Sequence, residues 1–153
     1  MKLFAQLFIL IWLMGHPSKT LDAITLINQQ RQLKNIPTLS ESITLDATAE
    51  AKCLDMINRN YWSHFAPDGT SPWYFFDMFN YNFKYAGENL VRDYSNDYDR
   101  VYALMGSPTH RANILNPEFL DIGIGRCNGK IDGVETNIMV QHFGTRLNYG
   151  DTK

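Results

Sequence analysis

Three side chains that lie far apart in the sequence could carry out chemistry together: His64, Glu88 and His110. Histidine titrates near neutral pH, so a pair of imidazoles can act as an acid and a base. Two imidazoles and one carboxylate can also ligate zinc or a related metal and leave a coordination position open. Their spacing matches no short contiguous motif, so only the fold could assemble such a site. Taken alone, each histidine is more often a hydrogen-bonded structural residue.

The other chemically active residues suggest structural roles. His142 lies on the apolar face of the last predicted strand, where a partly buried structural histidine is expected. Cys53 and Cys127 are expected to be buried; they can pair outside the cytoplasm or remain small hydrophobic residues, and free thiols are the favoured interpretation. The sequence contains no G-x-S-x-G elbow, phosphate loop or dinucleotide fingerprint.

Length and charge restrict the class of protein. A chain of 153 residues fits one domain, and its aromatic fraction of 13% favours a well-packed core. The net charge is -2, and no cluster of lysine and arginine is present. This composition argues against a nucleic-acid partner.

The N-terminus predicts a secretory signal. Lys2 precedes the apolar stretch "LFAQLFILIWLMG", which is shorter than the roughly 20 residues needed to span a bilayer. We therefore expect a signal peptide over about residues 1–18, whose removal takes His16 with it. The predicted location is secreted and extracellular, with no stable membrane span after cleavage. The alternative is an uncleaved N-terminal anchor that keeps the protein at the cell envelope.

Helices precede strands along the chain. Helical patterns cover about residues 20–34, 42–58 and 97–105, and a short helix after Ser71 is expected to bury Trp73, Phe76 and Phe79. Gly106 is expected to end the helix before His110. The alternating segments "DIGIGRC" and "NIMVQHFG" then predict a β-hairpin, while the residues around "AGENL" receive no strand assignment. This order predicts an α+β fold with helices packed on a small antiparallel sheet.

Four segments occur in an order typical of one known family: "SHFAPDGTSPW", "AGENL", "GSPTHRANILNPEFLDIGIG" and "VQHFG". In these segments the chain resembles the CAP superfamily, also called the SCP or cysteine-rich secretory protein, antigen 5 and pathogenesis-related 1 family, and most of all its short bacterial type. The resemblance covers about residues 20–145. It implies a CAP/SCP domain over 20–147 that folds as a three-layer α-β-α sandwich with a central cleft.

The resemblance also implies which residues line that cleft. His64 matches the family's first histidine, Glu88 matches the acid of its "GEN" segment, and His110 matches its second histidine. It implies His64 and His110 as ligands of a divalent metal such as zinc. The family's fourth cleft residue is a glutamate on the helix before His110, and here that helix offers only the shorter Asp97 or Asp99. Binding of the metal is therefore expected to be weak.

Two function classes follow from the resemblance. The first is a secreted, non-enzymatic binding module whose His/Glu cleft takes an extracellular lipid, polysaccharide or protein. The alternative is a metal-dependent hydrolase that uses the same cleft. The sequence shows neither an evident nucleophile nor a complete ligand set, and this favours the binding module.

Overall fold

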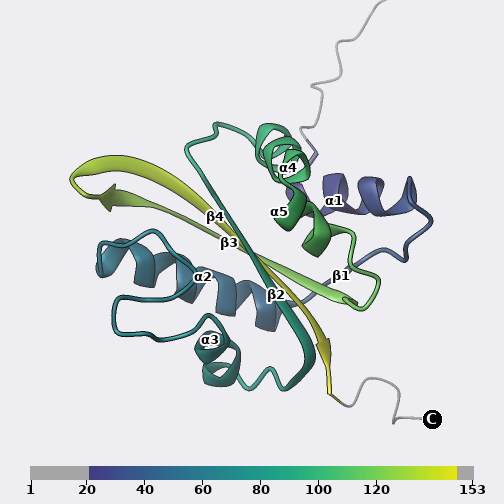
Figure 1. Ribbon diagram of the computed structural model, residues 1–153, viewed down its shortest axis with the longest axis horizontal. Coiled ribbons are helices and arrows are strands. Elements are labelled where there is room, and N and C mark those ends of the chain that lie inside the picture. The colour runs from purple at the N-terminus through teal and green to yellow at the C-terminus, as the bar shows by residue number, and fades with distance from the viewer. Residues whose placement is uncertain (1–20, 148–153) are drawn as a thin grey trace, which may run out of the picture.

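The computed structural model describes residues 21–147 and shows three layers, with a twisted sheet between two groups of helices (Figure 1). Helices α2 and α3 cover one face of the sheet, and α1, α4 and α5 cover the other. The predicted α-β-α sandwich is confirmed. The helices are α1 (Ala23–Gln32), α2 (Ile43–Asn58), α3 (Trp73–Met78), α4 (Asp97–Gly106) and α5 (Pro108–Ile114), and the strands are β1 (Ser40–Glu41), β2 (Phe83–Arg92), β3 (Asp121–Ile131) and β4 (Val134–Arg146).

The strands follow the order β1-β3-β4-β2 across the sheet. β3 and β4 form the predicted hairpin, closed by Asp132 and Gly133, which both have positive φ. β2 pairs antiparallel with β4 at one edge of the sheet, and the short β1 pairs parallel with β3 at the other. The β2–β4 register places Glu88 directly opposite His142, so the two side chains point to the same face.

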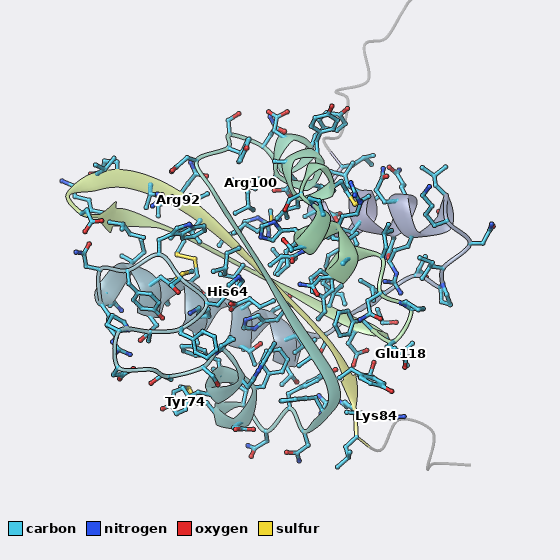
Figure 2. The ribbon with its side chains drawn as sticks, viewed as in Figure 1. His64, Tyr74, Lys84, Arg92, Arg100 and Glu118 are labelled. Atoms are coloured by element: carbon cyan, nitrogen blue, oxygen red, sulfur yellow. A yellow bond between two sulfur atoms is a disulfide. The ribbon has the colours of Figure 1, made fainter. Side chains whose placement is uncertain are left out.

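Each face of the sheet has its own apolar core, and side chains fill both interfaces (Figure 2). Under α1, α4 and α5, the core includes Ile27, Leu104, Ile114 and Phe143. On the opposite face α2 buries residues at helical spacing, namely Leu45, Thr48, Ala49, Lys52, Cys53 and Met56. Two of these six side chains are polar, which distinguishes this helix from an ordinary core helix.

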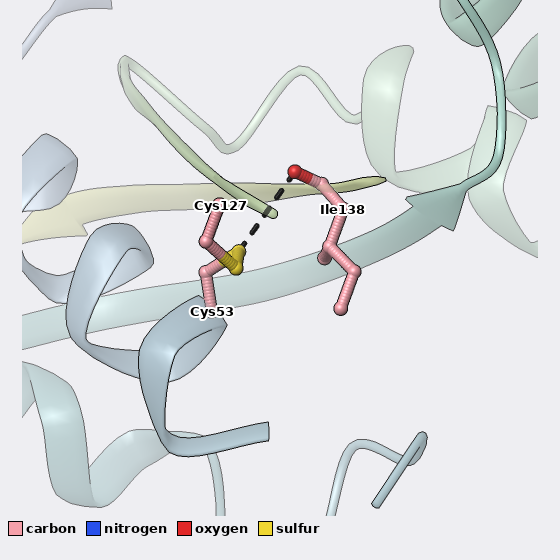
Figure 3. The surroundings of a disulfide bond; sticks show 3 residues. All are labelled: Cys53, Cys127 and Ile138. Carbon is pink, nitrogen blue, oxygen red and sulfur yellow. Dashed lines mark hydrogen bonds between the residues drawn. A yellow bond between two sulfur atoms is a disulfide. The ribbon is translucent and has the colours of Figure 1, made fainter. Parts of the chain in front are cut away.

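Glycines in β3 allow α2 to lie directly on the sheet. A Cβ at Gly123 would come within 2.1 Å of the Leu45 backbone, and one at Gly125 within 2.2 Å of the Ala49 backbone. Two residues further along β3, a disulfide joins Cys53 to Cys127, with 5.9 Å between their Cα atoms (Figure 3). The expectation of free thiols is therefore wrong, because the close approach of helix and strand brings the two Cα atoms within bonding range.

Several predicted elements need correction. α1 begins after Asp22, whose carboxylate accepts a hydrogen bond from the Thr25 N–H, and residue 20, where the predicted helix starts, lies outside the described residues. In the short third helix Phe75 is buried and Phe79 is 37% exposed, so the assignment of Phe79 to the core is wrong. Pro108 begins α5 at its first turn, where its missing N–H is tolerated.

The segment around "AGENL" belongs to β2, a ten-residue strand that the sequence pattern does not reveal. Its central residues from 87 to 91 are all buried, so they lack the alternation that marks a half-exposed strand.

The predicted signal peptide over 1–18 lies outside the described residues. Within 21–147, none of the helices has the length and apolar character needed to cross a membrane.

Candidate functional site

The centre of the site is the carboxylate of Glu88, in the middle of β2. Its side chain is only 2% exposed, and each of its oxygens meets an imidazole. His64 Nδ1 lies 2.6 Å from Oε1, and His142 Nε2 lies 2.9 Å from Oε2. We call these three residues the imidazole–carboxylate cluster. His64 comes from the loop after α2, while His142 comes from β4, so the sheet register and a loop together assemble the cluster.

The hydrogen bonds define the protonation states within the cluster. Burial alone opposes ionisation of Glu88, but the hydrogen bonds from His142 and His64 outweigh it and hold the pKa of Glu88 below its ordinary value. Burial also lowers the pKa of His142, so its ring is neutral at pH 7. A neutral ring that donates Nε2–H to the carboxylate must accept at Nδ1, where the Thr48 hydroxyl lies 2.8 Å away. The bond to Glu88 thereby sets the tautomer of His142, while the Thr48 hydroxyl also lies 2.8 Å from the Leu45 carbonyl oxygen.

His64 presents its free ring nitrogen outward. α2 ends at Asn58, Asn60 then takes a left-handed φ of 54°, and the chain turns into the loop that carries His64. Figure 2 shows His64 where β2 passes α2, and its side chain is 49% exposed. Nδ1–H donates to Glu88, so in the neutral ring Nε2 carries a lone pair, and no described residue hydrogen-bonds to that atom.

His110 lies on α5, on the other side of β2. Its Nδ1 is 2.9 Å from the hydroxyl of Ser107, the residue that precedes the helix. Burial, followed by the nearby His64 imidazole, lowers the pKa of His110, so this ring is also neutral at pH 7. As with His64, Nδ1 is held by a local partner, and Nε2 has no hydrogen-bond partner among residues 21–147.

Asparagine side chains fix α5 against β2. The Asn113 amide donates to the backbone carbonyl of Glu88 at 3.0 Å and to the Asn89 side-chain oxygen at 2.9 Å. In return, the Asn89 amide donates to the backbone carbonyl of His110 at 3.1 Å. The asparagines of "GEN" and "HRAN" therefore hold the strand of Glu88 beside the helix of His110. Sequence reasoning had assigned neither asparagine a role at the site.

The two aspartates considered as the fourth acid lie elsewhere. Asp97 is bound by Arg126 at 2.6 Å, by Arg100 at 3.0 Å and by the Ala23 N–H at 3.0 Å. Asp99 is exposed and accepts a hydrogen bond from Asn96. Neither therefore replaces the missing glutamate. The partner that the sequence did not identify is His142: the sequence placed it on the inner face of the last strand, but not opposite "GEN", because that segment received no strand assignment.

The donor set fits a metal ion only in part. Both oxygens of Glu88 are taken by imidazoles, so this carboxylate is not free to act as a ligand. Among residues 21–147, no group of three or more histidine, cysteine, aspartate or glutamate side chains is arranged to hold a metal ion. The outward Nε2 atoms of His64 and His110 remain as the two available ligands, and water would have to supply the others.

Comparison with known proteins identifies relatives of this chain. The sequence model of the CAP, or cysteine-rich secretory protein, family matches residues 24–143. The uncharacterized protein YkwD of Bacillus subtilis (strain 168) is 38% identical over 102 residues, which make up 67% of this chain. The chain spans only 40% of the length of YkwD.

Two solved structures share the fold. One is an extracellular protein of Bacillus anthracis that contains an SCP domain; it has a TM-score of 0.69 and 26% identity, and the match covers 81% of this chain and 39% of that one. The other is an outer surface protein of Borrelia burgdorferi, with a TM-score of 0.68, 23% identity, and coverage of 80% and 89%.

Proposed function

Because the chain belongs to the cysteine-rich secretory protein (CAP) family, we propose that it is secreted and acts outside the cell as a binding module. The solved relatives described above are an extracellular protein and an outer surface protein, which supports this location. The apolar stretch at the N-terminus, over about residues 1–18, would serve as the cleaved signal.

One observation carries the proposal: two partly exposed imidazoles are each held at Nδ1 and left free at Nε2. His64 is held by Glu88 and His110 by Ser107. Fixed rings lose little conformational freedom when a ligand binds, so they favour recognition of a polar group placed between them. The ligand would be a lipid, a polysaccharide or a protein that offers such a group.

The test is the set of molecules that co-purify with the protein. Protein would be isolated from culture medium, and bound molecules would be extracted and identified by mass spectrometry. We expect one class of molecule on the wild type and its loss in the double variant His64→Ala plus His110→Ala. Lys130→Ala, on the exposed end of the hairpin, is the matched control and should retain it. Equal recovery from the double variant would contradict the assignment of the site.

The same two nitrogens are expected to bind a divalent ion such as zinc weakly. Binding should weaken as the pH falls, because protonated imidazoles cannot act as ligands. Calorimetric titration of the apo protein with zinc chloride at pH 7.5 and at pH 5.5 would measure both effects. Unchanged zinc affinity in the double histidine variant would show that the ion binds elsewhere.

A hydrolase is the second candidate, and the 2.6 Å contact between His64 and Glu88 favours it. A carboxylate at Nδ1 makes Nε2 a better base, so His64 could take a proton from an attacking water. Both cysteines are in the disulfide and offer no thiolate nucleophile. Assays with peptide, ester and glycan substrates would separate the two functions, since turnover that disappears in His64→Gln would establish the hydrolase.

A further inference from the structure

Lys52 is a fully buried lysine in the middle of α2, on the face that contacts the sheet. Lysine is almost never buried without partners, because an ammonium loses its hydration there. Its Nζ donates to the backbone carbonyls of Ser63 at 2.9 Å and His64 at 2.7 Å, and to the Tyr61 hydroxyl at 3.1 Å. All three acceptors belong to the loop that carries His64.

These contacts use the full donor capacity of the ammonium group, which has three N–H bonds. Two of the acceptors are backbone carbonyls next to each other, so Lys52 holds the main chain at His64. The side chain of His64 then has little freedom except rotation about its own bonds. The 2.6 Å contact with Glu88 removes that freedom as well.

The charges nearby are consistent with this role. Burial lowers the pKa of Lys52, and the attraction of Glu88, followed by that of Asp55, opposes this lowering. The Lys52 ammonium in turn adds to the hydrogen bonds from the two imidazoles that lower the pKa of Glu88. Tyr61 continues the network outward, because its hydroxyl donates to Asp55 at 2.5 Å.

We propose that Lys52 is the positioning residue of the site: through the carbonyls of Ser63 and His64 it orients the His64 ring so that Nδ1–H meets Glu88 and Nε2 faces outward. The effect of this orientation on ligand binding rests on the proposed function, because the outward Nε2 is the atom that a ligand would meet. Its physical content is the orientation of one ring, which can be measured without any ligand.

The test is the ring tautomer of each histidine, measured by long-range ¹H–¹⁵N NMR at a pH above the titration of the imidazoles. In the wild type we expect His64 as the Nδ1–H form and His142 as the Nε2–H form, because each is set by its bond to Glu88. In Lys52→Met, His64 should lose its preference for Nδ1–H while His142 keeps Nε2–H. A general loosening of the fold would change both rings, so His142 serves as the internal reference.

Two further variants separate the contacts of Lys52. Tyr61→Phe removes the hydroxyl acceptor but keeps both carbonyls, so His64 should keep its tautomer. Lys130→Met, on the exposed hairpin, removes a lysine charge far from the site and should change neither ring. An unchanged His64 tautomer in Lys52→Met would overturn the proposal.

Should Lys52→Met fail to fold, the wild type still decides the question. Scalar couplings across the hydrogen bonds, from the Lys52 ¹⁵Nζ to the carbonyl carbons of Ser63 and His64, are expected, and their absence would contradict the proposal. The two proposals can fail separately. If the wild type bound no ligand but the tautomers behaved as expected, only the proposed function would be refuted. If the His64 tautomer stayed the same in Lys52→Met, only the role of Lys52 would be refuted.

Discussion

Glu88 and Asn89 are neighbours on β2, yet they are held in different ways by the two layers of the protein. Glu88 points toward α2 and meets ionisable groups: two imidazoles, with the Lys52 ammonium nearby. Asn89 points toward α5 and meets only neutral ones, namely the His110 carbonyl and the side chains of Gln141 and Asn113. One strand therefore separates a face organised by charge from a face organised by amide hydrogen bonds.

The difference predicts different responses to perturbation. Buried charges depend on the presence of their partners and on pH, because an unpaired buried ion is costly. Neutral amide pairs contribute about 1 kcal/mol each and are insensitive to pH. Substitutions and pH changes that reach only one layer can therefore test whether the two faces really differ.

The largest effect is expected from the disulfide, which ties only the α2 layer to the sheet. Its cysteines are separated by 74 positions, so its removal in Cys53→Ala plus Cys127→Ala should cost about 4 kcal/mol by the chain-entropy model. Urea unfolding of the variant and the oxidised wild type would measure the difference. A loss below about 1 kcal/mol would mean that the unfolded chain is little restricted by the bond.

Glu88→Gln should destabilise the protein by about 3 kcal/mol, because it removes the carboxylate that interacts most strongly with the buried Lys52 ammonium. The amide also places a donor against an imidazole N–H. Glu135→Gln is the matched control: its side chain is 77% exposed in a surface ion pair, so the change should be below about 1 kcal/mol. Equal losses for the two variants would remove the distinction between the charged face and the surface.

Acid should act mainly through the charged face, with a further contribution from His110 in the other layer. The folded-state pKa values of His142 and His110 lie below the ordinary value of 6.5, so the unfolded chain takes up these protons first. The stability they contribute is complete above about pH 6.5 and is lost as the pH falls toward their folded-state values. Glu88 adds a further loss below about pH 4.5, because its pKa is also lowered.

The expected change between pH 7 and pH 5 is on the order of 2 kcal/mol, since each group contributes at most about 1.4 kcal/mol per pH unit. Urea unfolding at a series of pH values would give the slope. In His142→Asn the slope between pH 6.5 and pH 5 should be smaller than in the wild type. An identical slope would assign the acid sensitivity to other groups.

The smallest effect is expected at His110, which is half-buried and touches Ser107. His110→Ala should change the free energy of unfolding by less than about 1.5 kcal/mol, the scale of one hydrogen bond. Ile114, on the same helix, is fully buried, and Ile114→Ala should cost about 2–5 kcal/mol. If both variants lost the same stability, and His110→Ala still bound zinc, His110 would be a structural histidine.

Much of the architecture could be predicted from local patterns. The spacing of apolar residues marked α2 almost to the residue, and the alternation in "DIGIGRC" and "NIMVQHFG" marked the terminal hairpin. The family resemblance identified His64, Glu88 and His110 as candidates, and the structure places the first two in direct contact. Such patterns are visible because they depend on residues close together in the chain.

Other features depended on contacts between distant segments. The β2–β4 register supplied one partner of Glu88, His142, which is 54 positions away in sequence, and a loop anchored on α2 supplied the other, His64, which is 24 positions away. The disulfide required α2 to lie against the glycines of β3. Lys52 lies within the predicted helix over residues 42–58, but only the packed loop shows what its ammonium contacts. The sequence determined which groups were present, while the tertiary structure decided their neighbours, because burial and hydrogen-bond geometry arise only when separate elements pack.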